Sequence, residues 1–476
     1  MSLLPQKIDL EKQLNIKGRF FLNHILILFL YLILLFYLVM SQQSVELFST
    51  NSMAGDVLSI QIYLIILSLA SLLSFLIITS RLKPSDHLIF VCAFVFYILA
   101  FSPLYYLFQS LTGIPFEFNA FDSLLYYNAH VDFENSGRGD FFSFISDQNF
   151  TFDDFGFTGY VHYTLSLFGE NIFVQRVFNA LFAAGSAVLT YRFCLRLFNG
   201  DQTRSIIAVS LLIFNNITIY FIASGLKECV MIFFVLLVFY HLNYVFTDKN
   251  KAKRLFYGIL GIICLIFIRP HMLPFIFLGI FVVNYAKLQS LMIKQSILFL
   301  GVVIFGGVIY VVATSGAVEI ITLGYSKILD PELQREIFNL KYEGYSIAEA
   351  YAVMFASISF GALSKIDFAI TNEDTFLFSY NLLLLNYLAY YLWTSIRMVL
   401  KEKRAEFYGL LIFILIYAAS MVVSFFAQEV RYLYMMYPFV YILIAYSIGR
   451  HKNPKLATLY NFGITAVIIF WNIRSL

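Results

Sequence analysis

The sequence predicts an all-α polytopic membrane protein with about thirteen transmembrane helices and two long loops on one side of the membrane. Of its 476 residues, 60% are hydrophobic and only 13% are charged, whereas a typical soluble domain has roughly 25% charged residues. Apolar runs of roughly 17 to 22 residues recur along the chain, and such runs cross a hydrocarbon core of about 30 Å as helices. A soluble globular fold is therefore excluded.

The first apolar run, Phe21 to Met40, follows a polar and basic N-terminal segment. It is too long for the core of a signal peptide and has no small-residue cleavage site, so it is expected to be retained as the first span. The predicted spans are 20–40, 58–79, 87–108, 172–196, 205–223, 228–247, 255–270, 271–286, 296–314, 375–396, 407–427, 432–449 and 456–473.

The orientation follows from the distribution of charge between the two sides of these spans. The side that holds the N-terminus carries 22 of the 32 Lys and Arg but 7 of the 29 Asp and Glu. The two sides therefore carry +15 and −12, which together give the net charge of +3. Because short cytoplasmic loops are enriched in Lys and Arg, the N-terminus is expected in the cytoplasm and the acidic side outside.

Two segments on the outer side are long, 109–171 and 315–374. Loops of this length in a compact protein are commonly functional or disordered, and their many Phe and Tyr residues argue against disorder. We expect short helices in both, and the stretch Tyr345 to Ser364 is apolar enough to lie in the interface or to re-enter the membrane. Because no low-complexity linker divides the chain, 1–476 is expected to form a single integral membrane domain.

Several kinds of site lack support in the sequence. The four cysteines, Cys92, Cys194, Cys229 and Cys264, lie in or at the edge of apolar runs without metal-ligand spacing, so they are expected to be small core residues. No phosphate-binding GxxxxGK[ST], GxGxxG, HExxH or GxSxG motif occurs. Ionisable residues are rare in the middle of the spans, whereas ion-coupled transporters usually carry them there. These absences favour work at the outer interface.

Acidic residues are the first candidates for chemistry. Asp122 lies in an otherwise apolar stretch after the third span, where partial burial would raise its pKa towards that of a useful base. The pair Asp153 and Asp154, with Glu228, could form an acidic site for a metal ion or an acceptor. Alternatively, the loop acids only solvate an exposed surface, and Glu228 complements the start of its helix. His162 and His241 have no second ligand nearby in sequence and are expected to be structural.

Cations are scarce on this acidic outer side, and most of them lie at the outer ends of spans. The candidates for binding a phosphate or diphosphate are Arg138, Arg176, Lys227, Arg269 with its neighbour His271, and Arg431. Charge-assisted hydrogen bonds from such groups, arginine forks above all, hold phosphates well. The alternative is that these side chains merely extend to the interface as long cationic residues often do.

The chain resembles the GT-C superfamily of membrane glycosyltransferases, in particular those that use lipid-linked sugars in bacterial surface polysaccharide synthesis. The resemblance covers about 122–269, with a weaker echo at 429–438. It rests on DSLLYYNA, on the long segment GFTGYVHYTLSLFGENIFVQRVFNALFAAGSAVLTYRFCLRLF, and on SGLKE, IRP and VRYLYMMYP. The family often has Asp-Glu after its first span, whereas this chain has Asp122–Ser123 after its third. Two additional N-terminal spans would account for that offset. The O-antigen and capsule repeat-unit polymerases are similar in size and in span number.

The resemblance implies a GT-C-like fold and a glycosyltransferase that uses an undecaprenyl-(di)phosphate-linked sugar or oligosaccharide at the periplasmic face of a bacterial inner membrane. Asp122 would be the catalytic base, and the cations would bind the donor phosphate. The implied partners are a polyprenyl-linked donor, a lipid-linked glycan acceptor and membrane lipids, not nucleic acid. A polymerase would add a chain-length regulator. No cofactor is required by the sequence, although the outer carboxylates would suit a divalent cation.

Two other classes remain open at the level of sequence. A flippase or other transporter for lipid-linked oligosaccharides would place ionisable residues around a central cavity between two pseudo-symmetric halves. A non-catalytic membrane scaffold would leave the outer acids and cations scattered. A catalytic site instead requires Asp122 to lie close to Lys227, Arg269 and Arg431, so the spatial arrangement of these residues discriminates between the classes.

Overall fold

The computed structural model describes residues 85–116, 122–148, 152–169, 171–245, 248–287, 346–351, 391–402, 404–423 and 430–448, with a few isolated positions elsewhere. Within these ranges every regular element is a helix, which confirms the all-α prediction for this part of the chain. The elements are α3 (Asp86–Thr112), α4 (Asp122–Ser136), α5 (Phe141–Asp147), α6 (Phe152–Phe168), α7 (Ile172–Leu197), α8 (Gln202–Ile213), α9 (Asn216–Ser224), α10 (Glu228–Leu242), α11 (Lys251–Ile268), η1 (Pro270–Met272), α12 (Leu273–Lys287), α19 (Trp393–Glu402), α20 (Ala405–Val423), α21 (Val430–Leu433), η3 (Tyr434–Met436) and α22 (Tyr437–Ile448).

Four segments in the described ranges are long and apolar enough to cross a membrane, Asp86–Tyr106, Ile172–Leu197, Pro270–Lys287 and Ala405–Val422. A fifth is the bent pair formed by α8 and α9, if the two count as one span. These helices indicate a membrane protein. The predicted spans 20–40, 58–79, 296–314 and 456–473 and most of 375–396 lie outside the described residues. The count of thirteen spans and the sidedness of the loops therefore stay predictions.

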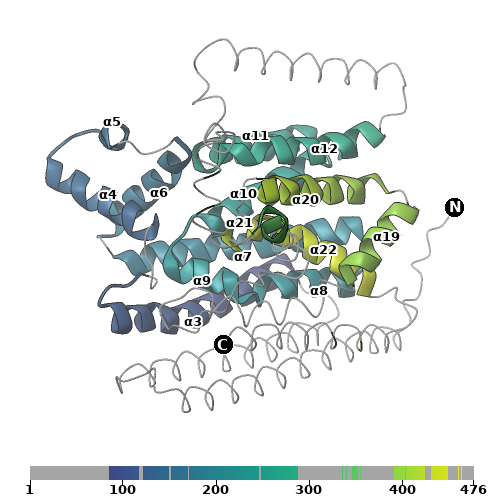
Figure 1. Cartoon of the computed structure of the whole chain (residues 1–476), viewed down its shortest axis with the longest axis horizontal. Coiled ribbons are helices and arrows are strands. Elements are labelled where there is room, and N and C mark those ends of the chain that lie inside the picture. Colours follow the sequence, from purple (N-terminus) through teal and green to yellow (C-terminus); the bar gives the residue numbers. More distant parts are fainter. Residues whose placement is uncertain are drawn as a thin grey trace, which may run out of the picture.

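The helices form a bundle with one continuous apolar core (Figure 1). Helices α10 and α22 are buried along nearly their whole length, which explains why their sequences are apolar on every side. Helices at the periphery instead expose large apolar side chains at helical spacing, such as Val91, Val95 and Leu99 of α3. An exposed apolar stripe of this kind suits contact with lipid chains rather than water.

Small residues let two of the helices cross closely. A Cβ atom added to Gly409 of α20 would lie 2.5 Å from the carbonyl oxygen of Gly279 on α12 and 2.3 Å from a methyl group of Val283. Neither helix could keep its position with a larger residue there. This contact has the character of the small-residue packing that brings helix backbones together in membranes.

The predicted span 205–223 is not one straight helix. It is divided into α8 and α9, which meet at an angle of 45°. The side chain of Asn215 caps α9 by accepting a hydrogen bond from the amide of Ile217 at 2.8 Å, and it donates to the hydroxyl of Tyr441 at 3.0 Å. A buried Asn that caps a new helix satisfies the backbone groups that the break exposes.

The third predicted span also ends later than expected. Helix α3 continues to Thr112, where Gly113 adopts a φ of 78° and donates its amide hydrogen to the carbonyl of Gln109. The left-handed conformation favours glycine, so this residue terminates the helix. Beyond it, α4, α5 and α6 project past one end of the bundle (Figure 1), and they form a small apolar cluster of their own. The expected short helices of segment 109–171 are thus present.

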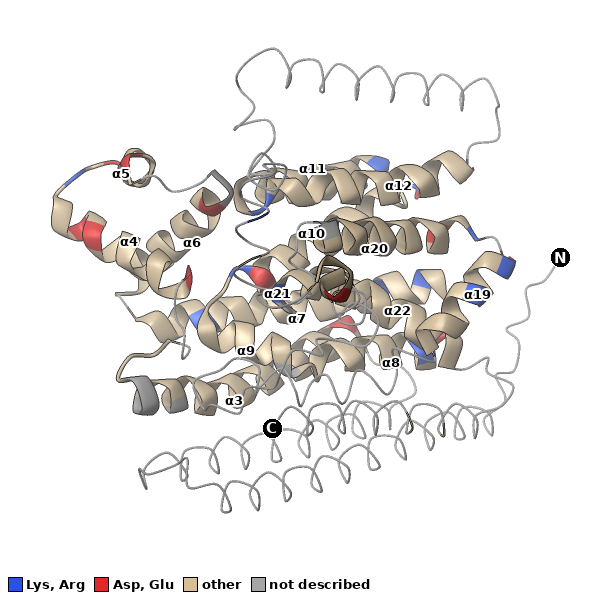
Figure 2. Cartoon of the chain, in the orientation of Figure 1, with Lys and Arg blue, Asp and Glu red and all other residues tan. Residues whose placement is uncertain are grey.

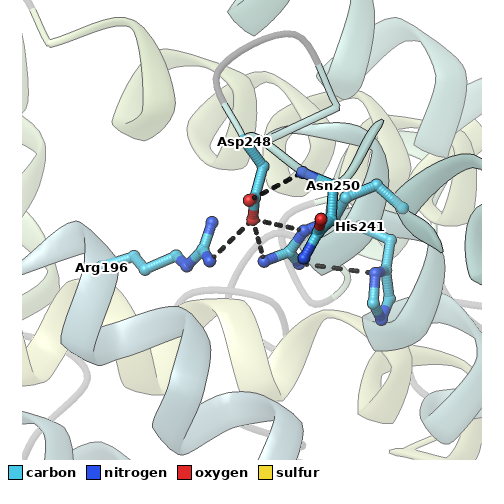
Figure 3. A network of polar contacts seen from close by, with 5 residues as sticks. Arg196, His241, Asp248 and Asn250 are labelled. Carbon is cyan, nitrogen blue, oxygen red and sulfur yellow. Dashed lines mark hydrogen bonds and ion pairs between the residues drawn. The ribbon is translucent and has the colours of Figure 1, made fainter. Parts of the chain in front are cut away.

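Charged residues gather at the end of the bundle that lies away from α4, α5 and α6 (Figure 2). There Asp248 accepts hydrogen bonds from Arg196 at 3.0 Å and from Arg254 at 2.7 Å, and Arg254 reaches Nδ1 of His241 at 3.4 Å (Figure 3). The bonds from Arg254 and Arg196 hold the pKa of Asp248 well below its usual range. This network joins the end of α7 to the turn between α10 and α11, so it fixes the bundle at the end away from α4–α6. His241 belongs to this network through its contact with Arg254.

Candidate functional site

Five elements bring charged side chains together at the end of the bundle that carries α4, α5 and α6. The residues are Asp122 at the start of α4, Asp154 in the first turn of α6, Lys227 and Glu228 at the start of α10, Arg269 at the end of α11, and Arg431 in α21. The contacts given below link them into one group, which we call the charge cluster. It contains three carboxylates and three cations from distant parts of the chain.

The widest sequence separation in the cluster is bridged by Asp122 and Arg431. A carboxylate oxygen of Asp122 lies 2.5 Å from the guanidinium of Arg431, and the two side chains remain 22% and 28% exposed. Asp122 is also the first residue of its helix, where the helix dipole favours a negative charge. This ion pair is therefore well formed and still open to another molecule.

A second pair lies one helical turn away. Tyr126, four residues after Asp122 on α4, donates its hydroxyl hydrogen to Oδ1 of Asp154 at 2.8 Å. The buried ammonium of Lys227 donates to the same carboxylate oxygen. Burial raises the pKa of Asp154, but the charge and hydrogen bond of Lys227, then the charge of Arg269, outweigh it and hold that pKa below its usual value. Asp154 is therefore an ionised carboxylate held by two donors.

Burial also keeps the Tyr126 hydroxyl protonated. It raises the pKa of Tyr126 well above its usual value, and the negative charges of Asp154 and Asp122 add to the effect. The ring of Tyr126 lies 5.9 Å from the Lys227 ammonium. Tyr126 is thus a permanent hydrogen-bond donor to Asp154, one helical turn from Asp122 on α4.

The turn that presents Lys227 is held by polar residues of α7. Gly225 adopts a φ of 75°, and Asn179 donates to the carbonyl of Leu226 at 3.1 Å. Arg176 donates to the carbonyl of Ala223 at 2.8 Å. The guanidinium of Arg176 fills the space beside Gly225, where a Cβ atom would overlap with it. Lys227 is consequently fixed by the buried network on α7.

Arg269 and Arg431 share an aromatic neighbour. The ring of Tyr432 lies 5.3 Å from the guanidinium carbon of Arg269 and 5.1 Å from that of Arg431. Arg431 also donates to the Tyr432 hydroxyl at 3.3 Å. Tyr417 donates to the backbone carbonyl of Tyr432 at 2.8 Å and so fixes the segment. The ring of Tyr432 thus attracts both guanidinium groups through cation–π contacts.

A close helix contact places Asp154 beside Arg269. Gly156, one half-turn along α6, faces the end of α11, where an added Cβ atom would lie 2.5 Å from the carbonyl oxygen of Phe267. His271 follows in η1, where the charges of Arg269, Lys227 and Asp154 act on its imidazole. The absence of a side chain at Gly156 therefore brings α6 against the end of α11.

Glu228 is the most deeply buried acid of the group, with 2% of its surface exposed. Its charge acts on both Tyr126 and Arg431. Within the described residues its Oε2 atom has no hydrogen-bond partner. A buried carboxylate oxygen without a donor is unusual and points to a group that is completed by another molecule.

Two of the predicted cations lie outside the cluster. Arg176 is buried and serves the packing of α7 against the turn before α10, as described above. Arg138 lies at the exposed turn between α4 and α5 and pairs with Asp147 at 2.5 Å. Asp153 precedes Asp154 in the first turn of α6, and its side chain is outside the described part of the chain. The predicted set of site residues is therefore brought together only in part.

The residues that sequence reasoning missed include Tyr432 and a second polar cluster on α4 and α6. In that second cluster, Nδ1 of His130 lies 2.9 Å from Nδ1 of His162, and an oxygen of Glu134 lies 4.0 Å from the former. Burial and then the neighbouring His130 lower the pKa of His162. Among the described residues, these three form the group whose ligand atoms are near enough for one metal ion. The four-residue spacing from Asp122 through Tyr126 and His130 to Glu134 was the available signal.

Comparison with models of known protein families, with curated proteins and with solved structures gives no match.

Proposed function

We propose that the protein is a membrane glycosyltransferase that uses a polyprenyl-phosphate- or diphosphate-linked sugar or oligosaccharide as donor and works at the outer face of the membrane. The observation that carries the proposal is the charge cluster. Five elements, separated by up to 309 residues in sequence, bring three carboxylates and three cations to one end of an apolar bundle. A scaffold would have no need to converge these groups.

The three cations of the cluster suit the phosphate of such a donor. Arg269 and Arg431 are guanidinium groups that can donate two hydrogen bonds in parallel to phosphate oxygens, and Lys227 supplies a point charge beside them. The charges of the three acids balance those of the three cations. A phosphate that binds the cations would therefore compete with the acids for their hydrogen bonds.

An apolar stripe on the same helix as Arg269 would suit the lipid chain of the donor. Ile259, Ile263 and Phe267 of α11 are 45%, 47% and 46% exposed and follow one another at four-residue spacing. This apolar stripe leads to Arg269 at the end of α11. A polyprenyl chain along the stripe would place its phosphate at the cation, as an amphipathic lipid requires.

The carboxylates differ in what they can do. Asp154 accepts hydrogen bonds from both Lys227 and Tyr126 and has a lowered pKa, so it is suited to hold Lys227 in place. Asp122 forms the partly exposed ion pair with Arg431 and is the first residue of α4. The two carboxylates are similarly exposed, but Asp122 is paired with the partly exposed Arg431, whereas Asp154 is held by the buried Lys227. We therefore assign Asp122 as the general base that an acceptor hydroxyl would meet.

The reaction is then a single displacement at the anomeric carbon. The acceptor oxygen attacks this carbon as Asp122 takes the hydroxyl proton, and the bond from the carbon to the phosphate oxygen breaks. The phosphate leaves with the bonding electron pair, and Arg269, Arg431 and Lys227 stabilise the charge that builds on it. One displacement inverts the anomeric configuration. If both substrates are lipid-linked repeat units, the same step elongates a polymer.

The direct test is to incubate the purified chain with a synthetic polyprenyl-diphosphate-linked repeat unit and to resolve the products. A ladder of increasing length identifies a polymerase, and a single added unit identifies a transferase of one sugar. Inverted anomeric configuration in the product is expected in both cases. Movement of intact lipid-linked substrate across a vesicle bilayer without new glycosidic bonds would instead identify a flippase and overturn the proposal.

A further inference from the structure

Helices α4 and α6 contact each other through two pairs of side chains, which are four residues apart on α4 and eight residues apart on α6. In the first contact Tyr126 meets Asp154, and in the next His130 meets His162. Since eight residues separate Asp154 from His162, the histidine pair lies about 12 Å further along α6. It is thus distinct from the charge cluster.

The second contact includes a third ligand group. Glu134 follows His130 by four residues on α4, which places both on one face of the helix. The ligand atoms of His130, Glu134 and His162 all lie within 4.8 Å of one another. Two imidazoles and a carboxylate are a common set of three protein ligands for zinc.

Direct hydrogen bonding accounts for only part of this arrangement. One imidazole can donate to the other across the 2.9 Å between their Nδ1 atoms. The distance of 4.0 Å from Nδ1 of His130 to the Glu134 carboxylate is too long for a hydrogen bond. An ion between the three groups would engage all of them at once. In a tetrahedral zinc site, bonds of about 2.0–2.1 Å place neighbouring ligand atoms about 3.3 Å apart.

The surroundings of the histidines hold their rings for such a role. The ring of His162 is stacked on Phe141 with a centroid separation of 4.0 Å and an interplanar angle of 4°, and the edge of Phe133 lies against it. His130 and His162 are buried, whereas the Glu134 side chain is 49% exposed and free to adjust by the remaining distance. The site therefore has two fixed ligands and one that can close.

We propose that His130, Glu134 and His162 bind a divalent first-row transition metal ion of the zinc type, with water in the fourth position. The ion joins the end of α4 to the middle of α6. It therefore fixes the two helices that carry Asp122 and Asp154, one at each start. Its role is to position these helices, and the chemistry at the charge cluster does not pass through it.

The test uses the full purified chain in detergent, treated with a chelator and then dialysed against ZnCl2. One tightly held zinc ion per chain is expected by elemental analysis. In a parallel sample loaded with CoCl2, the visible absorption should report tetrahedral coordination with nitrogen ligands. The proposal is overturned if the native chain retains no zinc above the level of a chelated blank and gives no such cobalt spectrum. This test does not depend on the folding of any variant.

The ligands are then tested by substitution. Glu134→Gln, at a half-exposed position, should preserve folding and weaken zinc binding at least tenfold, since loss of even a supporting group near a metal costs about 10–100-fold. His162→Gln should abolish the cobalt spectrum. Asp132→Asn, two residues from Glu134 on the same exposed part of α4, is the matched control and should bind zinc as the native chain does. Equal zinc affinity in Glu134→Gln, His162→Gln and Asp132→Asn would show that the ion is bound elsewhere.

Discussion

Replacing Lys227 with methionine removes the buried cation of the charge cluster at nearly constant side-chain volume. The ammonium of Lys227 is paired with Asp154, and its side chain is 4% exposed. The variant leaves Asp154 beside Tyr126 without its principal counter-charge. The predicted outcome is a loss of stability that a second substitution partly reverses.

The magnitude follows from burial. Removing one member of a buried ion pair costs about 3–5 kcal/mol, because the remaining charge is left poorly solvated. Asp154 keeps 20% of its side chain exposed, so water screens part of that charge and the expected cost is about 3 kcal/mol. In Lys227→Met with Asp154→Asn both charges are absent, and we expect the pair to show a coupling free energy of about 2 kcal/mol.

The effect depends on pH in a defined direction. Because the pKa of Asp154 in the folded protein lies below its usual value of 3.8, the pair adds stability that is fully present above that value. This stability is lost as the pH falls through the lower pKa of the folded state. The difference in stability between the native chain and Lys227→Met should therefore be constant near neutral pH and shrink below about pH 4.

Reversible unfolding of the purified chain in mixed micelles with increasing SDS measures these free energies. The four proteins of the cycle are the native chain, Lys227→Met, Asp154→Asn and the double variant. Two results together would refute the buried ion pair. The costs of the two single substitutions would sum to the cost of the double substitution within about 0.5 kcal/mol, and the stability difference between the native chain and Lys227→Met would not change at low pH.

Three further predictions concern other parts of the structure. Arg269→Ala and Arg431→Ala should each weaken binding of a polyprenyl phosphate by about tenfold or more, because each loses one charge-assisted hydrogen bond. Titration with a short-chain lipid phosphate measures this affinity, and unchanged affinity in both variants would show that the phosphate does not bind at the cluster. Arg176→Ala should destabilise the fold by about 2–4 kcal/mol in the SDS titration, since it strips the buried carbonyl of Ala223 of its donor; unchanged stability would show that Arg176 does not hold the turn before α10. Gly409→Ala should lower stability by about 1–3 kcal/mol through the contact with Gly279, whereas Gly139→Ala, with open space around its Cβ position, should not; equal stability of the two variants would argue against the close crossing of α12 and α20.

Much of the bundle followed from apolar run lengths. The predicted segments 172–196, 271–286 and 407–427 correspond to α7, η1 with α12, and α20, because a helix long enough for the membrane must be apolar over that length. The break at Asn215 was not foreseen. Asn215 stabilises the break by capping α9 and by a tertiary hydrogen bond to Tyr441, 226 residues away, and no local pattern reveals this distant partner.

The cations of the charge cluster were predicted from a different signal, which is the scarcity of Lys and Arg on the side richer in acids. That signal selected Lys227, Arg269 and Arg431, which converge, and also Arg176, which does not. The four look alike in sequence, since each lies at the outer end of a span. Only the surrounding carbonyl groups, such as that of Ala223, decide that Arg176 is used in packing.

The histidine pair shows the same limit. His162 was interpreted as structural because no second ligand lies nearby in sequence, but His130 is brought to it by the contact between α4 and α6, 32 residues apart. The local half of the pattern, His130 with Glu134, was visible as a four-residue repeat. The other half depends on how two helices pack, which periodicity does not specify.

The most direct measurement of the central claim is single-turnover transfer from a polyprenyl-linked donor by the native chain and by Asp122→Asn. We expect the variant to bind the donor with an affinity within about twofold of the native value and to transfer at least about 100-fold more slowly, because a general base is lost. Asp132→Asn, on the exposed part of the same helix, should transfer at the native rate. Turnover by Asp122→Asn at the native rate would contradict the assignment of the cluster as a catalytic centre.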